Sequence, residues 1–170
     1  LISFRKSIKT HQYFRMKTIC IVGGGIVGIS TAFYLSSKLN LDKDVEIVII
    51  EANEIAGSAS GKAGGFLARD WHQGRDAELA RLSFALHSSL AKEIGAEKIG
   101  YRQCEAIQVR CPSSKSSSMW YDSVRARSVI AKKENAAQVV PYKLVKEMLE
   151  RCSKSTRVQI GTVMNMKRLD

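Results

Sequence analysis

Three glycines near the amino terminus have the spacing of a dinucleotide-binding turn. Gly23, Gly25 and Gly28 follow a short apolar run and open a stretch with helical periodicity. In such a turn the first glycine permits a tight bend, the second lets the backbone approach a pyrophosphate, and the third lets the helix pack closely on the strand. The first N–H groups of the helix, at Ile26 and Val27, would then point towards the phosphates. The motif predicts a pyrophosphate site at this turn.

A carboxylate stands at the end of the next apolar run. Glu51 directly follows the mainly apolar residues 45–50, and from there it can accept hydrogen bonds from ribose hydroxyls. A hydrogen bond to a charged group contributes about 1.5–3 kcal/mol. The same charge repels a 2′-phosphate, so NADP is the least favoured dinucleotide. Glu51 alone would also fit a solvated strand end, but strand, glycine turn, helix, strand and carboxylate in this order indicate a dinucleotide site.

A second segment of small residues, 57–65, is rich in glycine, alanine and serine. Such residues let a backbone approach a ligand closely. The glycine motif itself does not distinguish FAD from NAD. The extra backbone amides and hydroxyls of the second segment favour FAD, because the flavin ring of that larger cofactor also needs donors. The alternative is a flexible surface loop.

Short apolar runs and helical stretches alternate along the chain, which is typical of an α/β fold with a parallel sheet. The run 18–22 predicts a strand buried on both faces, with Cys20 in the core. The stretch 76–94 predicts an amphipathic helix. Its apolar face carries Leu79, Leu82, Leu86 and Leu90. The other expected elements are a helix ending near 39, strands at 45–50, 101–109 and 158–163, a polar linker at 112–118 and a helix starting near 141.

The 170 residues carry 27 Lys and Arg against 16 Asp and Glu, a formal net charge of +11. Residues 1–17 hold five of the basic residues and no acid, so removing them takes the charge from +11 to +6. We therefore expect a basic leader at 1–15, either a mitochondrial presequence or upstream sequence included ahead of Met16, and one folded domain at 16–170. The basic residues of 110–157 form no continuous block, which favours a solvated face over nucleic-acid binding.

No sequence feature indicates a metal site, a catalytic residue or a transmembrane segment. The four cysteines form no CxxC pair and have no histidine at ligand spacing, which points to a reducing compartment and a cytoplasmic protein. Trp71 and His72 follow the glycine-rich segment, which is a position from which they could border the flavin ring. A surface histidine beside a partly buried tryptophan is the more frequent arrangement, so no role is assigned to either residue. No apolar run approaches the roughly 20 residues that a spanning helix needs.

Taken together, these motifs resemble the amino-terminal part of the D-amino-acid oxidase and glycine oxidase superfamily. The glycine turn, Glu51, the segment 57–65 and residues 137–143 occur in the order seen in its members, and the resemblance covers about 16–166. It implies an α/β, Rossmann-like FAD-binding domain with a parallel central sheet. Members of the superfamily are about twice this length. The substrate domain and a second glycine-rich flavin motif are therefore expected to be largely missing from this chain, which would be a fragment.

The resemblance implies an FAD-dependent oxidoreductase that takes a hydride from an amine or amino acid, a small-molecule substrate, onto flavin N5. An NAD-dependent dehydrogenase and a non-catalytic dinucleotide-binding module are the alternatives. Under the resemblance, the turn at 23–28 holds the pyrophosphate, Glu51 the adenosine ribose, residues 58–65 the pyrophosphate and the flavin surroundings, and Val163 the adenine. The implied cofactor contacts are Gly23, Gly25, Ile26, Val27, Gly28, Glu51, Ala52, Ser58, Ala59, Ser60, Gly64, Gly65 and Val163.

Overall fold

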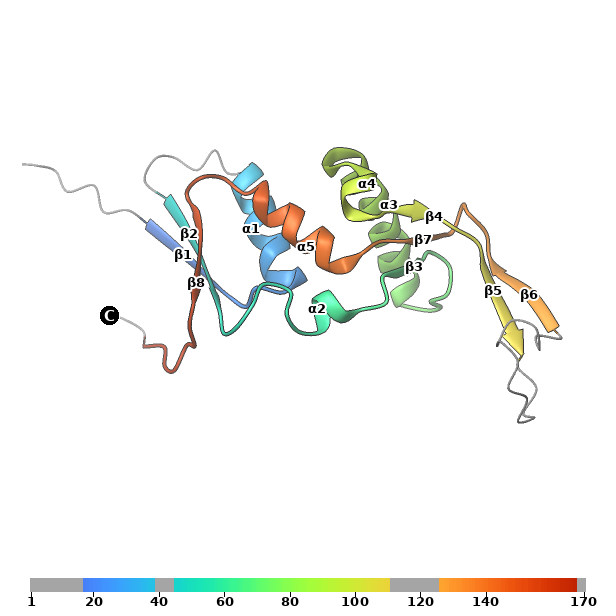
Figure 1. The fold of residues 1–170 in the computed structure, drawn as a ribbon, viewed down its shortest axis with the longest axis horizontal. Coiled ribbons are helices and arrows are strands. Elements are labelled where there is room, and N and C mark those ends of the chain that lie inside the picture. The colour runs from blue at the N-terminus through green and yellow to red at the C-terminus, as the bar shows by residue number, and fades with distance from the viewer. Residues whose placement is uncertain (1–16, 39–44, 111–125, 168–170) are drawn as a thin grey trace, which may run out of the picture.

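A computed structural model describes residues 17–38, 45–110 and 126–167 (Figure 1). The basic leader predicted at 1–15 and the polar linker predicted at 112–118 lie outside these residues. The elements, in chain order, are β1 (Lys17–Val22), α1 (Ile26–Lys38), β2 (Val45–Glu51), α2 (Ala59–Lys62), β3 (Phe66–Ala68), α3 (Asp76–Ile94), α4 (Ala96–Ile99), β4 (Arg102–Gln103), β5 (Ala106–Arg110), β6 (Ala126–Ala131), β7 (Ala136–Gln138), α5 (Pro141–Glu150) and β8 (Thr156–Ile160).

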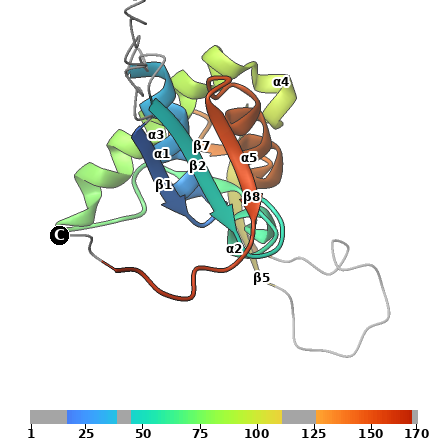
Figure 2. The ribbon, with the colours of Figure 1, turned by 90° about the vertical axis from the view of Figure 1, so that its left-hand side faces the viewer.

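The central sheet has the strand order β1-β2-β8, and both pairings are parallel. Strand β1, helix α1 and strand β2 form the βαβ unit that the glycine motif predicted. In Figure 2 the three strands lie in front, and α1 and α5 lie behind them. The carboxyl ends of β1 and β2 therefore meet at one edge of the sheet, the position at which open α/β sheets bind ligands.

The main core lies between the sheet and these two helices. Ile47 and Ile49 of β2 are fully buried, as is Ile29 of α1. Val145 and Met148 of α5 close the same cluster. Burial of one such side chain contributes about 1.5–3 kcal/mol, so this layer fixes how α1 and its amino terminus sit on the sheet.

Strand β1 corrects one prediction, because it is not buried on both faces and Cys20 is exposed. Ile19 and Ile21 pack against the core from one face of the strand. Thr18, Cys20 and Val22 lie on the other face and are exposed. The reason is that β1 is an edge strand, and within the described residues α1 and α5 cover only one face of the sheet (Figure 2).

Two other predicted strands have different bounds. The strand expected at 101–109 is divided into β4 and β5, because β4 pairs with β7 while β5 pairs with β6. At the break, the N–H of Cys104 donates a hydrogen bond to the carbonyl of Ala136. The strand expected at 158–163 starts earlier and ends earlier, as β8, and leaves Val163 in the irregular segment that follows.

Helix α3 has the predicted bounds, but most of its leucine stripe is not buried. Leu79, Leu82 and Leu86 are 63%, 57% and 50% exposed, while Leu90 is 8% exposed. The helix instead buries Leu90, Ala91 and Ile94 near its carboxyl end, where α4 packs. Over the described residues, no element covers the leucines of its first half.

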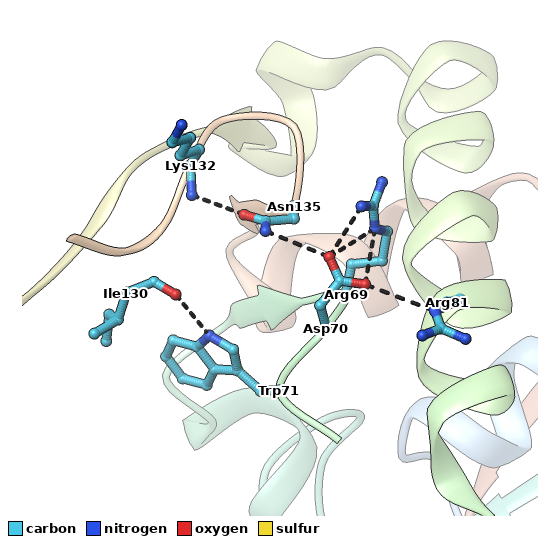
Figure 3. A network of polar contacts seen from close by, with 7 residues as sticks. All are labelled: Arg69, Asp70, Trp71, Arg81, Ile130, Lys132 and Asn135. Carbon is cyan, nitrogen blue, oxygen red and sulfur yellow. Dashed lines mark hydrogen bonds and ion pairs between the residues drawn. The ribbon is translucent and has the colours of Figure 1, made fainter. Parts of the chain in front are cut away.

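A polar network holds β3, α3 and the turn between β6 and β7 together (Figure 3). The Asp70 carboxylate pairs with Arg69 at 2.9 Å and with Arg81 of α3 at 3.7 Å, and accepts a hydrogen bond from Asn135 at 3.3 Å. The hydrogen bond from Arg69 is the main reason that the pKa of the Asp70 carboxyl lies below its ordinary value. Trp71 adds a hydrogen bond from its indole N–H to the Ile130 carbonyl.

Candidate functional site

The turn between β1 and α1 has the geometry that its glycines predicted. Gly23 adopts a positive φ of 104°, and its N–H donates to the Ile50 carbonyl at 2.8 Å. A Cβ on Gly28 would overlap the Gly23 carbonyl oxygen, and a Cβ on Gly25 would lie 2.8 Å from the Ser60 hydroxyl. The positive φ of the first glycine and the lack of room at the other two thus explain why the motif needs all three.

Gly24, which lies inside the motif, was missed by the sequence reasoning. A Cβ here would overlap Ile55 and would approach the Glu51 carboxylate to 3.1 Å. Its N–H donates a hydrogen bond to Glu51 Oε2 at 2.7 Å. The available signal was the run of three consecutive glycines, where the motif requires only the first and the third.

The Glu51 carboxylate lies at the end of β2, against the glycine turn. Its second oxygen, Oε1, accepts a hydrogen bond from the N–H of Asn53 at 3.0 Å. Backbone N–H groups, that of Asn53 first and that of Gly24 second, hold the pKa of the Glu51 carboxyl below its ordinary value. A carboxylate oxygen has two acceptor positions, so each can still accept a ribose hydroxyl. The role of Asn53 was also missed, since it depends on the turn after β2.

Ser60 brings the second small-residue segment onto the first. Its hydroxyl oxygen accepts a hydrogen bond from the N–H of Ile26, the first residue of α1, at 3.0 Å. An α-helix leaves its first four N–H groups without intrahelical acceptors, so this hydroxyl satisfies one of them. The segment 57–65 contains the one-turn helix α2, and is therefore not simply a surface loop. Ser58 precedes this turn, is exposed and makes no capping hydrogen bond with its side chain.

Two adjoining cavities run along this edge of the fold. The first, of about 340 Å³, is lined by the glycine turn together with Val27, Thr31 and Ser60. The second, of about 380 Å³, shares Ile26 and Ser60 with the first and continues past Ala59 and Gly65. We call the two together the cofactor groove. Its first half presents helix N–H groups, which suit a pyrophosphate, and its second half is mainly apolar, which suits a planar ring. Thr31 carried no sequence signal.

The remaining predicted residues lie at the rim or away from it. Ala52 and Gly64 are exposed, and Gly64 has no atom within 4 Å of where a Cβ would stand. Gly65 has a φ of 72°, and its carbonyl accepts the N–H of Val139 at 2.8 Å. Val163 is half-buried in the segment after β8, which is tied to the site because the Gly161 N–H donates to the Glu51 carbonyl at 2.8 Å. Glu51, Ser60 and the glycine turn are the residues that the fold brings together.

The profile of the DAO family, described as "FAD dependent oxidoreductase", matches residues 18–163. The chain belongs to this family. A protein named as an oxidoreductase in Schizosaccharomyces pombe is 33% identical over 156 residues, which are 85% of this chain and 41% of that protein. The oxidoreductase named TDA3 in Saccharomyces cerevisiae is 47% identical over 98 residues, 55% of this chain and 18% of that protein.

The DAO fold is also found among solved structures. Glycine oxidase from Bacillus cereus superposes with a TM-score of 0.64 at 20% identity, over 85% of this chain and 46% of that enzyme. The predicted resemblance and the α/β, Rossmann-like fold are thus confirmed. The chain spans less than half the length of each of these relatives.

The described residues form neither a metal-binding cluster nor a membrane-spanning helix. In the described ranges no three side chains of His, Cys, Asp or Glu gather closely enough to hold a metal ion. Among the helices of the same residues, none combines the length and apolar character required to cross a membrane.

Proposed function

We propose that this chain binds FAD and forms the cofactor-binding part of an oxidoreductase that oxidises an amine or amino acid. One observation supports this most directly: the glycine turn and the Ser60 hydroxyl line a single groove at the amino terminus of α1, and the Glu51 carboxylate is hydrogen-bonded to the same turn through the Gly24 N–H. When bound, FAD would supply the redox chemistry by accepting a hydride from the substrate. The chain itself supplies binding and orientation, and the proposed domain is residues 16–170.

The groove residues would divide the cofactor between them. The first N–H groups of α1, at Val27 and Gly28, would hold the pyrophosphate with help from the helix dipole, which contributes about 0.3–1 kcal/mol for an exposed anion. Glu51 would accept the ribose hydroxyls. Ser60 can keep the Ile26 N–H as donor and turn its own hydroxyl proton to a phosphate oxygen, because a hydroxyl donates and accepts at once.

The other end of the groove would border the flavin ring. Gly65 and Ala59 line its apolar half. The small-residue segment to which they belong favours FAD over NAD, because its backbone amides and hydroxyls supply the donors that the flavin ring needs. Val163 would meet the adenine from the segment that Glu51 anchors. We also propose an amine or amino acid as substrate, which accords with the name of the glycine oxidase neighbour. A cytoplasmic location, with a mitochondrial one as the alternative, is the compartment that we infer from the cysteine pattern.

FAD titration of the purified protein tests the proposal. We expect tight uptake of FAD with flavin absorbance, release of flavin on denaturation, and no comparable uptake of NAD. Glu51→Gln should lower the affinity about tenfold or more, and Gly25→Val should abolish it because the side chain fills the groove. Glu54→Gln, an exposed carboxylate three residues along, is the matched control. If wild-type protein takes up no FAD, or if both site variants keep full occupancy, the proposal fails.

Amine oxidation is tested separately from binding. Under anaerobic conditions, an amine substrate should bleach the flavin absorbance of the FAD-loaded protein. Retained FAD that no amine or amino acid reduces would support the non-catalytic dinucleotide-binding module instead.

A further inference from the structure

Helix α3 presents an apolar face to solvent. Leu79, Leu82 and Leu86 are exposed, and within the described ranges no element covers them. Steps of three and four residues place these exposed leucines along one stripe of the helix. Ala85 and Ser89, which are also exposed, lie beside the stripe and are small enough for a second helix to approach closely. A contiguous exposed apolar stripe is typical of an interaction surface.

Charged side chains flank the exposed leucines at both ends of α3. Arg75 and Glu78 stand at its start, Lys92 and Glu93 at its end, and all four are exposed. Arg75 and Glu93 are 93 − 75 = 18 positions apart, about five helical turns, so they lie on the same line along the helix. Glu78 and Lys92 are 92 − 78 = 14 positions apart, close to about four turns. We call Arg75 with Glu93 the first charge pair and Glu78 with Lys92 the second.

Two α3 helices packed antiparallel would bring the opposite charges of both pairs together. When Leu82 lies opposite Leu86 of a second copy, symmetry places Leu86 opposite Leu82 of that copy. The two members of each charge pair then lie near one another across the interface, because they stand at nearly equal distances before and after these leucines. In a parallel arrangement every charge would instead lie beside its own copy. Charge complementarity sets the orientation of an interface more than its affinity, and here it favours the antiparallel arrangement.

The Glu78 carboxylate has an oxygen left for this contact. Its Oε1 pairs with Arg81 in the same helix at 2.5 Å. A carboxylate accepts through both oxygens, and the Glu78 side chain is 84% exposed, so a cation of a second copy can reach Oε2.

A cavity of about 160 Å³ adjoins the exposed leucines, between α1, α3 and α5. Tyr34 and Leu86 form part of its lining, and most of the remaining lining is apolar. In the antiparallel arrangement, Leu79 of the second copy lies opposite Ser89, at the level of this cavity. Interface side chains that contribute most to affinity often fill pockets of the partner. The cavity therefore offers a place for this leucine.

We propose that the exposed leucines of α3 bind the same face of a second copy of this chain, with the two helices antiparallel. Burial of three leucines from each copy stabilises the dimer, and the two charge pairs fix its orientation. An interface built on one helix from each copy is small, so we expect dissociation in the micromolar range. The inference does not depend on FAD binding.

Sedimentation equilibrium of the full chain at micromolar concentrations tests the dimer. Leu82→Glu should raise the dissociation constant at least tenfold, because it places a charge from each copy in the apolar stripe. Val129→Glu is the matched control and should leave the dimer intact, since Val129 lies on β6 and is 58% exposed against 57% for Leu82. Circular dichroism of both variants checks that the fold is unchanged.

Charge reversal tests the orientation. Glu78→Lys and Lys92→Glu should each weaken the dimer severalfold, because each places like charges together. An equimolar mixture of the two variants should dimerise as well as wild type, since opposite charges then meet at both ends. Under mild oxidation, Ala85→Cys should cross-link to its own copy, whereas Ser89→Cys should not, because the two copies of position 89 lie on opposite sides of the dimer axis.

Four results would overturn the proposal. The first is a monomer at every concentration, including one in which slow hydrogen exchange of α3 shows that another segment of the chain covers the leucines. The second is an equal effect of Leu82→Glu and Val129→Glu, which would indicate unspecific association. The third is an unchanged dimer in both charge variants, and the fourth is cross-linking of Ser89→Cys, which would indicate a parallel arrangement.

Discussion

The carboxylate of Glu51 accepts a hydrogen bond from the backbone N–H of Gly24, with 2.7 Å between oxygen and nitrogen. This contact joins the end of β2 to the turn between β1 and α1. Glu51 also takes the N–H of Asn53 on its other oxygen and the N–H of Gly161 on its carbonyl. Glu51 therefore holds three backbone positions together at the edge of the sheet, even without a bound cofactor.

Replacing Glu51 should destabilise the fold even without FAD. In Glu51→Gln one oxygen is exchanged for an NH₂ group, which cannot accept the N–H that faces it. Leaving a buried donor unsatisfied costs about 1–3 kcal/mol, and since Glu51 is only half-buried we expect a loss at the lower end, about 1 kcal/mol. Urea unfolding of the cofactor-free protein would measure this loss. A variant as stable as wild type would contradict the structural role of the carboxylate, and Glu54→Gln provides the comparison.

The same contact predicts a pH dependence of stability. Because the folded-state pKa of Glu51 is lowered, its stabilising contribution is complete above the unfolded pKa of about 4.3 and is lost as the pH falls through the lower, folded-state value. The difference in unfolding free energy between wild type and Glu51→Gln should therefore shrink from pH 7 towards pH 3. A difference that stays constant over this range would show that the carboxylate is not preferentially ionised in the folded protein.

Gly28→Ala should destabilise the protein more than Gly25→Ala. Alanine is favoured over glycine in a helix by about 1 kcal/mol, so propensity alone predicts that Gly28→Ala stabilises. The added methyl overlaps the Gly23 carbonyl, a backbone atom that cannot move aside, and such overpacking costs about 1–3 kcal/mol. At Gly25 the obstacle is the Ser60 side chain, which can rotate. Thermal unfolding of the two variants compares the effects, and a more stable Gly28→Ala protein would refute the close approach.

Alanine substitutions at the neighbouring residues Gly64 and Gly65 should differ in their effect on stability. Gly65→Ala should cost more than about 2 kcal/mol, because the residue has a positive φ and its Cβ would overlap the Val139 carbonyl oxygen. Gly64→Ala has open space around it and should change stability by less than about 0.5 kcal/mol. Equal effects in chemical denaturation would mean that the approach of Val139 to Gly65 is wrong.

Ser60→Ala should destabilise the cofactor-free protein by about 0.5–2 kcal/mol, the cost of losing a helix-capping oxygen. With saturating FAD the penalty should be larger, since the variant also loses the proposed hydrogen bond from the Ser60 hydroxyl to a phosphate oxygen and binds FAD more weakly. Ser58→Ala is the control, as its hydroxyl does not cap α2. Melting temperatures with and without FAD give all four values. The idea fails if Ser60→Ala and Ser58→Ala behave alike.

Cys20 should be alkylated faster than Cys152. The first is exposed on the uncovered face of the sheet, whereas burial raises the pKa of the half-buried Cys152 thiol and lowers its thiolate fraction. Timed reaction with iodoacetamide, followed by peptide mass spectrometry, measures both rates. A protected Cys20 would indicate that this face of the sheet is covered in solution.

The parts of the fold that could be predicted are those with local signals. The glycine spacing, the apolar run of β2 and the bounds of α3 all depend on neighbours within one or two turns of chain. The exposure of Cys20 could not be predicted, because it depends on which strand forms the edge of the sheet and which face the helices cover. The division of the strand at 101–109 likewise depends on two distant partners, β7 and β6.

The site shows the same division. Glu51 and the motif glycines were predicted as cofactor contacts. FAD titration of Glu51→Gln and Gly25→Val tests this role. The contacts that hold them in place, from Gly24, Asn53 and Ser60, were not predicted. The Ser60 hydroxyl meets α1 across 34 positions, and no spacing rule in a single sequence relates the two.

The strand order β1-β2-β8 also bears on the sequence of folding events. Lys17 of β1 pairs with Val45 only 28 positions away, whereas Ile47 of β2 pairs with Thr156 across 109 positions. Contacts between distant residues form slowly, since a long loop must close before they yield any stabilisation. During synthesis the glycine turn and its carboxylate can assemble as the βαβ unit emerges, and β8 docks last, carrying Gly161 to the Glu51 carbonyl. The phosphate-binding end of the groove is therefore expected to form before the segment that would meet the adenine.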